Sequence, residues 1–240
     1  MFGFLGRHTI GEAGLLHGMT DWHCHILPGV DDGFKRLEDS LAALGRYELL
    51  GLSEVWLTPH VMEDVPNETE ALRSRFSELC DAYGGPVRLH LAAEYMMDNL
   101  FEGRLEARDL LPLGTGGRHL LVETSYFNPP AGMVETLKRI KTAGFFPVLA
   151  HPERYMYMDM DDYTALMDSG VRLQLNLGSL TGLYGKEAQH KACQLLKKGC
   201  FSIAGTDLHS LSQLDFITKA RSLPGNIFKS LSKTDMLTTI

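Results

Sequence analysis

The chain has 240 residues, of which 44% are hydrophobic and 22% are charged, and its formal net charge is -7 at pH 7. These values predict one large globular domain with a sizeable core. The acidic balance, without a basic stripe, argues against binding to nucleic acid. No apolar run approaches the ~20 residues that span a bilayer, so no transmembrane segment is predicted. The four cysteines form no C-x-x-C pair, which favours a reducing, cytoplasmic compartment.

Strand-like and helix-like segments alternate along the chain. The predicted strands are 19–25, 54–58, 87–94, 119–124, 146–150, 172–177 and 201–205. The predicted helices are 37–50, 68–83, 131–143, 161–168 and 186–198, the second of them capped by Asn67. One domain over residues 19–223 is expected, preceded by an N-terminal arm at 1–18 and followed by a C-terminal tail or helix at 224–240.

The alternation of about seven strands with helices predicts parallel strand pairing. Polar residues of metal-binding type follow six of the predicted strand ends. In a (β/α) barrel, functional residues come from the C-terminal ends of several strands, whereas a doubly wound sheet concentrates its site at one switch point. We therefore predict an α/β fold of the barrel type.

The most informative stretch is residues 21–33, which read DWHCHILPGVDDG. Because side chains on a strand repeat every two residues, Asp21, His23 and His25 are expected to share one face, with the two imidazoles ~7 Å apart. Asp207 and His209 show the same spacing after the last strand. This spacing allows each pair to grip the same ion or adjacent ions.

Four further candidates lie at the ends of other strands. They are His60, Glu94, Glu123 and His151. A carboxylate at the end of an apolar strand is costly to bury without a positive partner, and a divalent cation supplies one. His90 and His119 lie four residues before Glu94 and Glu123, ~13 Å down each strand, and are too distant to join such a site.

Five histidines and at least three acids exceed the ligands of one tetrahedral ion, so two or three divalent ions are expected. Mixed imidazole and carboxylate ligands suit Zn, Mn or Fe better than Ca or Mg alone. Closely spaced metals generate hydroxide near neutral pH and assist phosphoryl displacement. Arg154 follows His151 by three residues and offers planar donors for phosphate oxygens.

Seven ordered motifs resemble the PHP (polymerase and histidinol phosphatase) superfamily. They are H-x-H at 23–25, ILPGVDDG at 26–33, TPH at 58–60, the isolated Glu94, VE at 122–123, HPERY at 151–155 and D-x-H at 207–209. The ILPGVDDG and HPERY versions are similar to the bacterial capsule and exopolysaccharide branch, the manganese-dependent protein-tyrosine phosphatases of the CpsB/CapC/YwqE type. The resemblance runs from about residue 19 to about residue 223.

This resemblance implies a distorted seven-stranded (β/α) barrel, the PHP fold, with three divalent ions. Manganese is the expected metal, and iron and zinc are the alternatives. Matched motif by motif, it assigns His23, His25, Glu94 and Asp207 to the first ion. It assigns Glu94, Glu123 and His151 to the second ion, and Asp32, His60 and His209 to the third. Asp32 is preferred to Asp31 because the family ligand is the second Asp of the DDG triplet. Arg154 would bind the phosphate.

One departure from the family pattern concerns phosphate binding. The family tail usually reads D-A-H-N-L-x-x-R, whereas this chain has Leu214 where that arginine would fall. Lys35 and Arg36, which follow the DDG loop, are substitutes by their position alone.

The resemblance implies a phosphoric monoester hydrolase that removes phosphate from tyrosine on a protein through a metal-activated hydroxide. Its substrate would be a bacterial tyrosine autokinase of polysaccharide export, met in the cytoplasm or at the inner membrane face. None of the four cysteines opens a C-x5-R motif, so a cysteine-dependent phosphatase is excluded. Two alternatives stay open, a small-molecule phosphatase of the histidinol-phosphatase kind and a noncatalytic module that retains metals.

Overall fold

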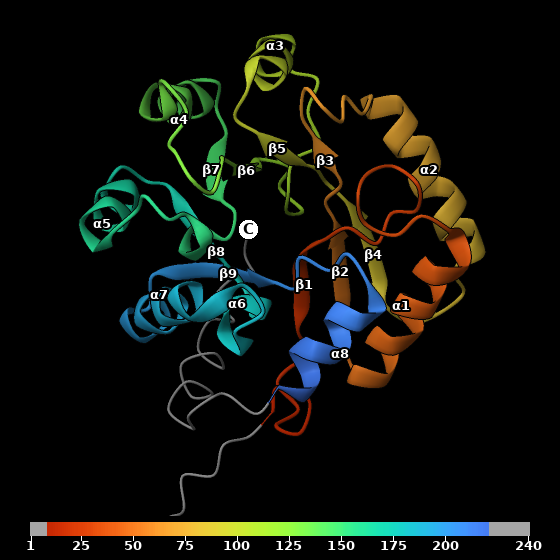
Figure 1. Ribbon diagram of the computed structural model, residues 1–240. Coiled ribbons are helices and arrows are strands. Elements are labelled where there is room, and N and C mark those ends of the chain that lie inside the picture. The colour runs from red at the N-terminus through yellow and green to blue at the C-terminus, as the bar shows by residue number, and fades with distance from the viewer. Residues whose placement is uncertain (1–8, 221–240) are drawn as a thin grey trace, which may run out of the picture.

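The computed structural model describes residues 9–220 (Figure 1). The strands are β1 (Thr20–Cys24), β2 (Glu54–Leu57), β3 (His60–Val61), β4 (Arg88–Leu91), β5 (Glu94–Met96), β6 (His119–Glu123), β7 (Phe146–Leu149), β8 (Arg172–Asn176) and β9 (Phe201–Gly205). The helices are α1 (Leu37–Leu50), α2 (Thr69–Ala82), α3 (Asn99–Ala107), α4 (Met133–Thr142), α5 (Met160–Asp168), α6 (Leu177–Thr181), α7 (Gly185–Lys198) and α8 (Leu211–Lys219), with a 3-10 turn at Pro152–Arg154.

The strands form a ring surrounded by helices (Figure 1). One parallel sheet has the order β1-β2-β4, and the other has the order β3-β5-β6-β7-β8-β9. β3 continues the position of β2, and β5 that of β4, after a two-residue break in each. A parallel bridge between Cys24 and Leu208 joins β1 to the end of β9. The predicted distorted (β/α)7 barrel is therefore confirmed.

The break between β2 and β3 has a backbone cause. It contains Pro59, which has no N–H to donate to a neighbouring strand. The pairing continues irregularly across it, because Thr58 N donates to the Cys24 carbonyl and Glu94 N donates to the Pro59 carbonyl. This kink sets His60 and Glu94 at the start of new short strands, directly opposite each other in register.

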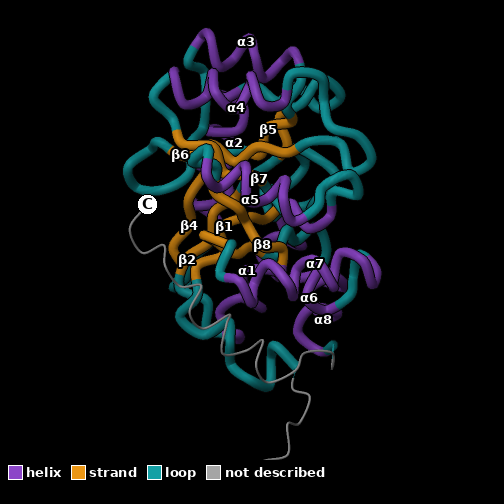
Figure 2. Tube along the Cα trace, turned by 90° about the vertical axis from the view of Figure 1, so that its left-hand side faces the viewer, coloured by secondary structure: helices purple, strands orange, loops and turns teal. Residues whose placement is uncertain are grey.

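Two layers of apolar packing hold the barrel. Alternate strand residues such as Leu120 and Val122 belong to the main core between strands and helices. A second cluster draws Trp56, Leu121 and Ile203, among others, from different strands, so it fills the inside of the ring. Figure 2 shows the strands in the middle with helices above and below them.

Several predicted elements match closely, and others differ. The helix predicted at 37–50 is α1, but the strand predicted at 87–94 is divided into β4 and β5. The helices α3, α6 and α8 were not predicted. Asn67 does not cap α2, whose N-cap is Glu68. The Asn67 side chain instead donates to the carbonyls of Val30 and His60, each at 2.9 Å.

The expectation that Asp21 shares a face with His23 and His25 is wrong. The pairing of β1 shifts register between Asp21 and Cys24, which breaks the simple alternation. The buried Asp21 carboxylate accepts hydrogen bonds from the Tyr47 and Thr206 hydroxyls, both at 2.6 Å. Asp21 therefore ties β1 to α1 and to the end of β9, and burial raises its pKa.

Part of the predicted N-terminal arm packs on the domain. Ile10 and Leu16 are buried, and Gly11 N donates to the Thr218 carbonyl at 3.1 Å. Residues 1–8, the boundary predicted at 223 and the tail at 224–240 lie outside the described residues. Within residues 9–220, no helix combines the length and apolar character needed to cross a membrane.

Candidate metal centre

Nine side chains of metal-binding type meet at the end of the barrel where the parallel strands finish. They are His23, His25, Asp32, His60, Glu94, Glu123, His151, Asp207 and His209. They lie on or beside β1, β3, β5, β6, β7 and β9, and β8 contributes none of them. Parallel strands end at the same rim, so residues far apart in sequence become neighbours there.

The first group of ligand atoms is buried and comprises His23, His25, Glu94 and Asp207. His23 Nε2 lies 3.1 Å from Glu94 Oε2 and 3.4 Å from Asp207 Oδ1. His25 Nε2 lies 3.3 Å from each of the same two oxygens. The two Nε2 atoms are 3.1 Å apart, so four donor atoms surround one point.

The second nitrogen of each of these imidazoles fixes the direction of its lone pair. His23 Nδ1 lies 3.1 Å from Gln174 Oε1, and His25 Nδ1 lies 2.7 Å from Asp31 Oδ2. Both partners are acceptors, so each Nδ1 donates its hydrogen, and each ring presents a lone pair at Nε2 once that nitrogen has lost its proton. Two facing lone pairs cannot bond to each other, but a cation between them satisfies both. Such outer contacts are typical of metal-binding histidines.

The second group contains His60, Glu94 and Glu123. His60 Nδ1 lies 3.2 Å from Glu94 Oε2 and 3.1 Å from Glu123 Oε1. His151 stands beside this group, with its Nε2 2.9 Å from Glu94 Oε1 and 3.9 Å from Glu123 Oε2. The resemblance assigned His151 to the ion held by the two glutamates, and the structure brings His60 to the same oxygens as well.

The third group contains His25, Asp32, His60 and His209 and is the most accessible. Asp32 Oδ1 lies 3.3 Å from His209 Nε2 and 3.6 Å from His60 Nε2. Its side chain is 71% exposed, because it lies on the DDG loop rather than on a strand. His209 holds the pKa of this carboxyl well below its ordinary value.

The unpaired atoms of the site fit divalent cations. Within the described part of the chain, the buried His60 Nδ1, Glu94 Oε2 and Glu123 Oε1 have no well-formed hydrogen bond. A buried carboxylate oxygen in that state is costly. Ligands held ~2.1 Å from a metal lie roughly 3.0–3.5 Å from one another, which matches the contacts among these donors.

The carboxylates also control the protonation of the imidazoles. Burial lowers the pKa of His23, but Glu94 and Asp207 outweigh burial and raise it to about 9. Burial raises the pKa of Glu94, but the nearby His23 and His60 outweigh that effect and hold it well below its usual range. Protons and divalent cations therefore compete for the same atoms.

β8 supports the centre through amide side chains. Gln174 Oε1 accepts hydrogen bonds from His23 Nδ1 and from the main-chain N–H of His151, the latter at 3.0 Å. Asn176 Nδ2 donates to Asp207 Oδ2 at 2.8 Å. Neither amide residue, nor the contact of Asp31 with His25, is predicted from the sequence. Polar residues at alternate positions of the buried run RLQLN were the available signal for the amides.

Two of the nine metal-binding-type residues have strained backbone. His151 has φ 34° and Asp207 has φ 52°, in the left-handed region that non-glycine residues rarely adopt. Asp207 N donates to the His23 carbonyl at 2.7 Å, and Gln174 holds His151 N. Such strain is typical of functional sites, where the surrounding hydrogen bonds maintain it.

Arg154 lies beside the metal centre between two aromatic rings. Its guanidinium carbon is 4.3 Å from the Tyr126 ring centroid and 4.0 Å from that of Tyr184. Its Nη1 donates to Asp207 Oδ2 at 2.8 Å. Burial lowers the pKa of Arg154, but the Asp207 carboxylate and the two tyrosines outweigh burial and raise it. The two rings fix the guanidinium in one plane.

A cavity of about 700 Å³ opens above the metal centre. Residues of the centre line it together with Arg154, Tyr126, Tyr184 and Phe216. These three aromatic residues are not predicted from the sequence, because each lies on a loop or helix without a motif.

Lys35 and Arg36, the suggested substitutes for the missing arginine, lie elsewhere. The Lys35 ammonium donates to the Asp31 carbonyl, and the exposed Arg36 pairs with Asp39 at 2.8 Å. Neither lies in the cavity wall. Their predicted role in substrate binding stays a prediction that this geometry does not support.

Leu214 is fully buried on α8, so the position of the family arginine faces the core. The preceding residue, Gln213, holds the turn that carries Asp207 and His209. Its Nε2 donates to the Asp207 carbonyl at 2.8 Å and to the Tyr184 hydroxyl at 3.1 Å. Its Oε1 accepts from His209 N at 2.8 Å.

A parallel barrel with clustered imidazoles and carboxylates at its C-terminal rim, and an arginine beside them, is typical of proteins that carry out metal-assisted hydrolysis. The chain belongs to the CpsB/CapC family of capsular polysaccharide synthesis, whose model matches residues 19–215. This finding confirms the resemblance inferred from the sequence motifs.

The relatives agree with this assignment. The tyrosine-protein phosphatase YwqE of Bacillus subtilis is 28% identical over 207 residues, which cover 84% of this chain and 81% of YwqE. The putative tyrosine-protein phosphatase CapC of Staphylococcus aureus is 24% identical over 208 residues, with the same coverage. A structure from work on B. subtilis YwqE and Streptococcus pneumoniae CpsB, described as unique metal-dependent tyrosine phosphatases, matches with a TM-score of 0.76 at 26% identity. The match covers 90% of this chain and 87% of that chain.

Proposed function

We propose that this protein is a metal-dependent protein-tyrosine phosphatase. The observation that carries the proposal is the convergence of His23 Nε2 and His25 Nε2 on oxygens of Glu94 and Asp207, at 3.1–3.4 Å. Arg154 pairs with the Asp207 carboxylate, so a phosphoryl group bound at the metal centre would lie beside its guanidinium. The names of the relatives support phosphotyrosine as the substrate.

The side chains around the centre have distinct roles in this proposal. Bound divalent cations lower the pKa of water and neutralise phosphoryl oxygens. Arg154 donates the N–H groups that Asp207 does not occupy to the phosphoryl oxygens. Tyr126, Tyr184 and Phe216 give the cavity an aromatic wall against which a phenyl ring can pack. The phenolate that leaves has a pKa near ~10, so it needs less protonation than an alkoxide would.

Three ions, with manganese as the first choice, fit the three overlapping groups of ligand atoms. We further propose that the substrate is a tyrosine autokinase of polysaccharide export, in line with the capsular description of the family. Such an encounter places the enzyme in the cytoplasm, recruited to the inner membrane face by its substrate. The four free cysteines agree with a reducing compartment.

Metal-dependent turnover tests the proposal directly. The protein is stripped of metal, reloaded separately with Mn²⁺, Fe²⁺, Zn²⁺ or Mg²⁺, and analysed for bound metal. Each form is then assayed with a phosphotyrosine peptide, a phosphoserine peptide, histidinol phosphate and p-nitrophenyl phosphate. Preference for the phosphotyrosine peptide supports the proposal. Preference for histidinol phosphate would point to the small-molecule alternative, and bound metal without any turnover would point to a noncatalytic module.

A further inference from the structure

A second cavity of about 370 Å³ adjoins the one above the metal centre. The two cavities share three lining residues, Tyr126, Arg154 and Tyr184. The stacked rings and guanidinium therefore form a common wall, with the metal centre on one side and the second cavity on the other. A ligand long enough to cross that wall would occupy both cavities together.

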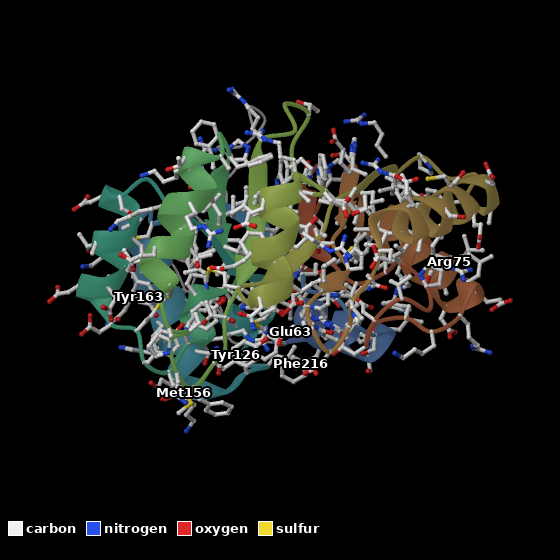
Figure 3. All side chains as sticks on the ribbon, turned by 90° about the horizontal axis from the view of Figure 1, so that it is seen from above. Glu63, Arg75, Tyr126, Met156, Tyr163 and Phe216 are labelled. Atoms are coloured by element: carbon white, nitrogen blue, oxygen red, sulfur yellow. The ribbon has the colours of Figure 1, made fainter. Side chains whose placement is uncertain are left out.

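The second cavity has an apolar rim that faces solvent. Phe127 is 67% exposed and Met156 is 58% exposed, and both line this cavity. Met156 N donates to the Tyr126 carbonyl at 2.8 Å, so the loop after β6 and the loop after the 3-10 turn are tied together. Figure 3 shows Tyr126, Met156 and Phe216 at the same edge of the molecule. Burying these rim side chains under a ligand would be favourable.

Several charged groups of the second cavity are already engaged within the chain. Lys191 Nζ donates to the carbonyls of Tyr155 and Met158, at 2.8 and 2.9 Å, and lies 3.8 Å from Glu187. Arg154 pairs with Asp207. Lys186 and Glu187 also line the cavity, but both are exposed to solvent and their charges are opposite. The surface that gains most from an occupant is therefore the apolar rim, which favours an apolar side chain over a second phosphate.

We propose that the second cavity binds an apolar side chain of the substrate polypeptide close to the phosphotyrosine. The inference rests on the proposed phosphatase function and specifies its substrate as an extended protein segment. Continuity with the catalytic cavity supports this occupant, since consecutive residues of an extended chain advance only ~3.3–3.6 Å and a few of them cross the shared wall. A small phosphate ester fills the first cavity alone and gains nothing from Phe127 or Met156.

A peptide series tests this subsite. The wild-type protein is assayed with phosphotyrosine peptides in an alanine background, each carrying leucine at one position from three residues before to three residues after the phosphotyrosine. We expect leucine at one or two positions, on one side only, to raise kcat/KM by roughly tenfold or more, the gain from burying one such side chain. p-Nitrophenyl phosphate turnover and metal content are measured in parallel.

The double variant Phe127→Ala, Met156→Ala should reduce that leucine-to-alanine ratio to about one. The matched control Leu49→Ala removes a side chain that is 84% exposed on α1, outside both cavities, and should keep the ratio. Equal kcat/KM for all peptides with the wild-type protein would overturn the subsite and leave the phosphatase proposal standing, and so would a ratio that survives in the double variant. Turnover of p-nitrophenyl phosphate without turnover of any peptide would overturn both. If the double variant does not fold, the wild-type peptide series still decides.

Discussion

The metal centre and the cavity walls above it are built from different parts of the chain. Of the nine ligand-type side chains, eight lie on strands or within a few residues of a strand end and one, Asp32, lies on the DDG loop, and most of the nine are buried. The walls, in contrast, come from the loop at Tyr126, the turn at Tyr184 and the start of α8, and Phe127 and Met156 reach into solvent. In the proposed function this difference separates two tasks, because the strand ends would hold the metal and the loops would contact the substrate.

Removing a shared ligand should break the centre while sparing the barrel. Glu94→Ala deletes a carboxylate that contacts four imidazoles, so we expect phosphatase activity to fall by at least about a thousandfold. Bound metal should fall as well, while circular dichroism should show a folded protein. Substantial activity in this variant, or wild-type activity after complete metal removal, would contradict the assignment.

Metal affinity should weaken steeply in acid. Glu94 and Asp207 raise the pKa of His23 to about 9 in the metal-free site, so below that pH a proton must leave before a cation binds. For this one group, affinity should fall about tenfold per pH unit, or about a hundredfold from pH 8 to pH 6. Competition titration with a chelator measures this slope, and a flat profile would contradict it.

Replacing Arg154 tests whether this residue serves metal binding or only phosphate binding. Arg154→Ala should lower kcat/KM for a phosphotyrosine peptide by about a hundredfold, because it removes donors to the phosphoryl group. Elemental analysis should show nearly unchanged metal content. The matched control Arg75→Ala removes an exposed arginine of α2 that pairs with Glu78, away from the site (Figure 3). Loss of metal in Arg154→Ala would assign this residue to the centre through its contact with Asp207.

The smallest effect concerns the opposite end of β6, where His119 begins the strand that Glu123 ends. Burial, together with Arg172 and Arg118, lowers the pKa of His119 to about 4. The folded state thus disfavours the protonated ring, and stability is lost as the pH falls from about 6.5 toward 4. His119→Leu should remove about 1 kcal/mol of this loss at pH 5, measured by urea unfolding against wild type at pH 5 and 7.5. An identical pH slope in the two proteins would rule out this role.

The sequence predicted the barrel and the nine ligand-type residues, because both depend on strand ends and on motifs that are local in sequence. The predictions were wrong at positions where the tertiary structure differs from what the local sequence pattern indicates. Strand alternation predicts that Asp21 shares a face with His23 and His25, but a register shift in β1 turns its side chain toward Tyr47. Asn67 has the chemistry of a helix cap, yet its amide ties the DDG loop to β3.

The cavity wall was beyond sequence reasoning for a related reason. Tyr126 follows β6, and Tyr184 lies in the turn before α7. The two rings come near each other only because the barrel places both of them against Arg154. Neither residue carries a periodic or spacing signal. The buried Leu214 shows the same limit, since its orientation depends on how α8 packs on the barrel.

The three groups of ligand atoms overlap in pairs, and this overlap has a consequence for how the enzyme is loaded. His25 belongs to the first and third groups, Glu94 to the first and second, and His60 to the second and third. A neutral imidazole offers one lone pair, so His25 and His60 can each bind only one ion at a time, whereas the two oxygens of Glu94 can serve two ions. We expect an ion at the first group to orient Glu94 for an ion at the second group, so that filling one of these groups strengthens binding at the other.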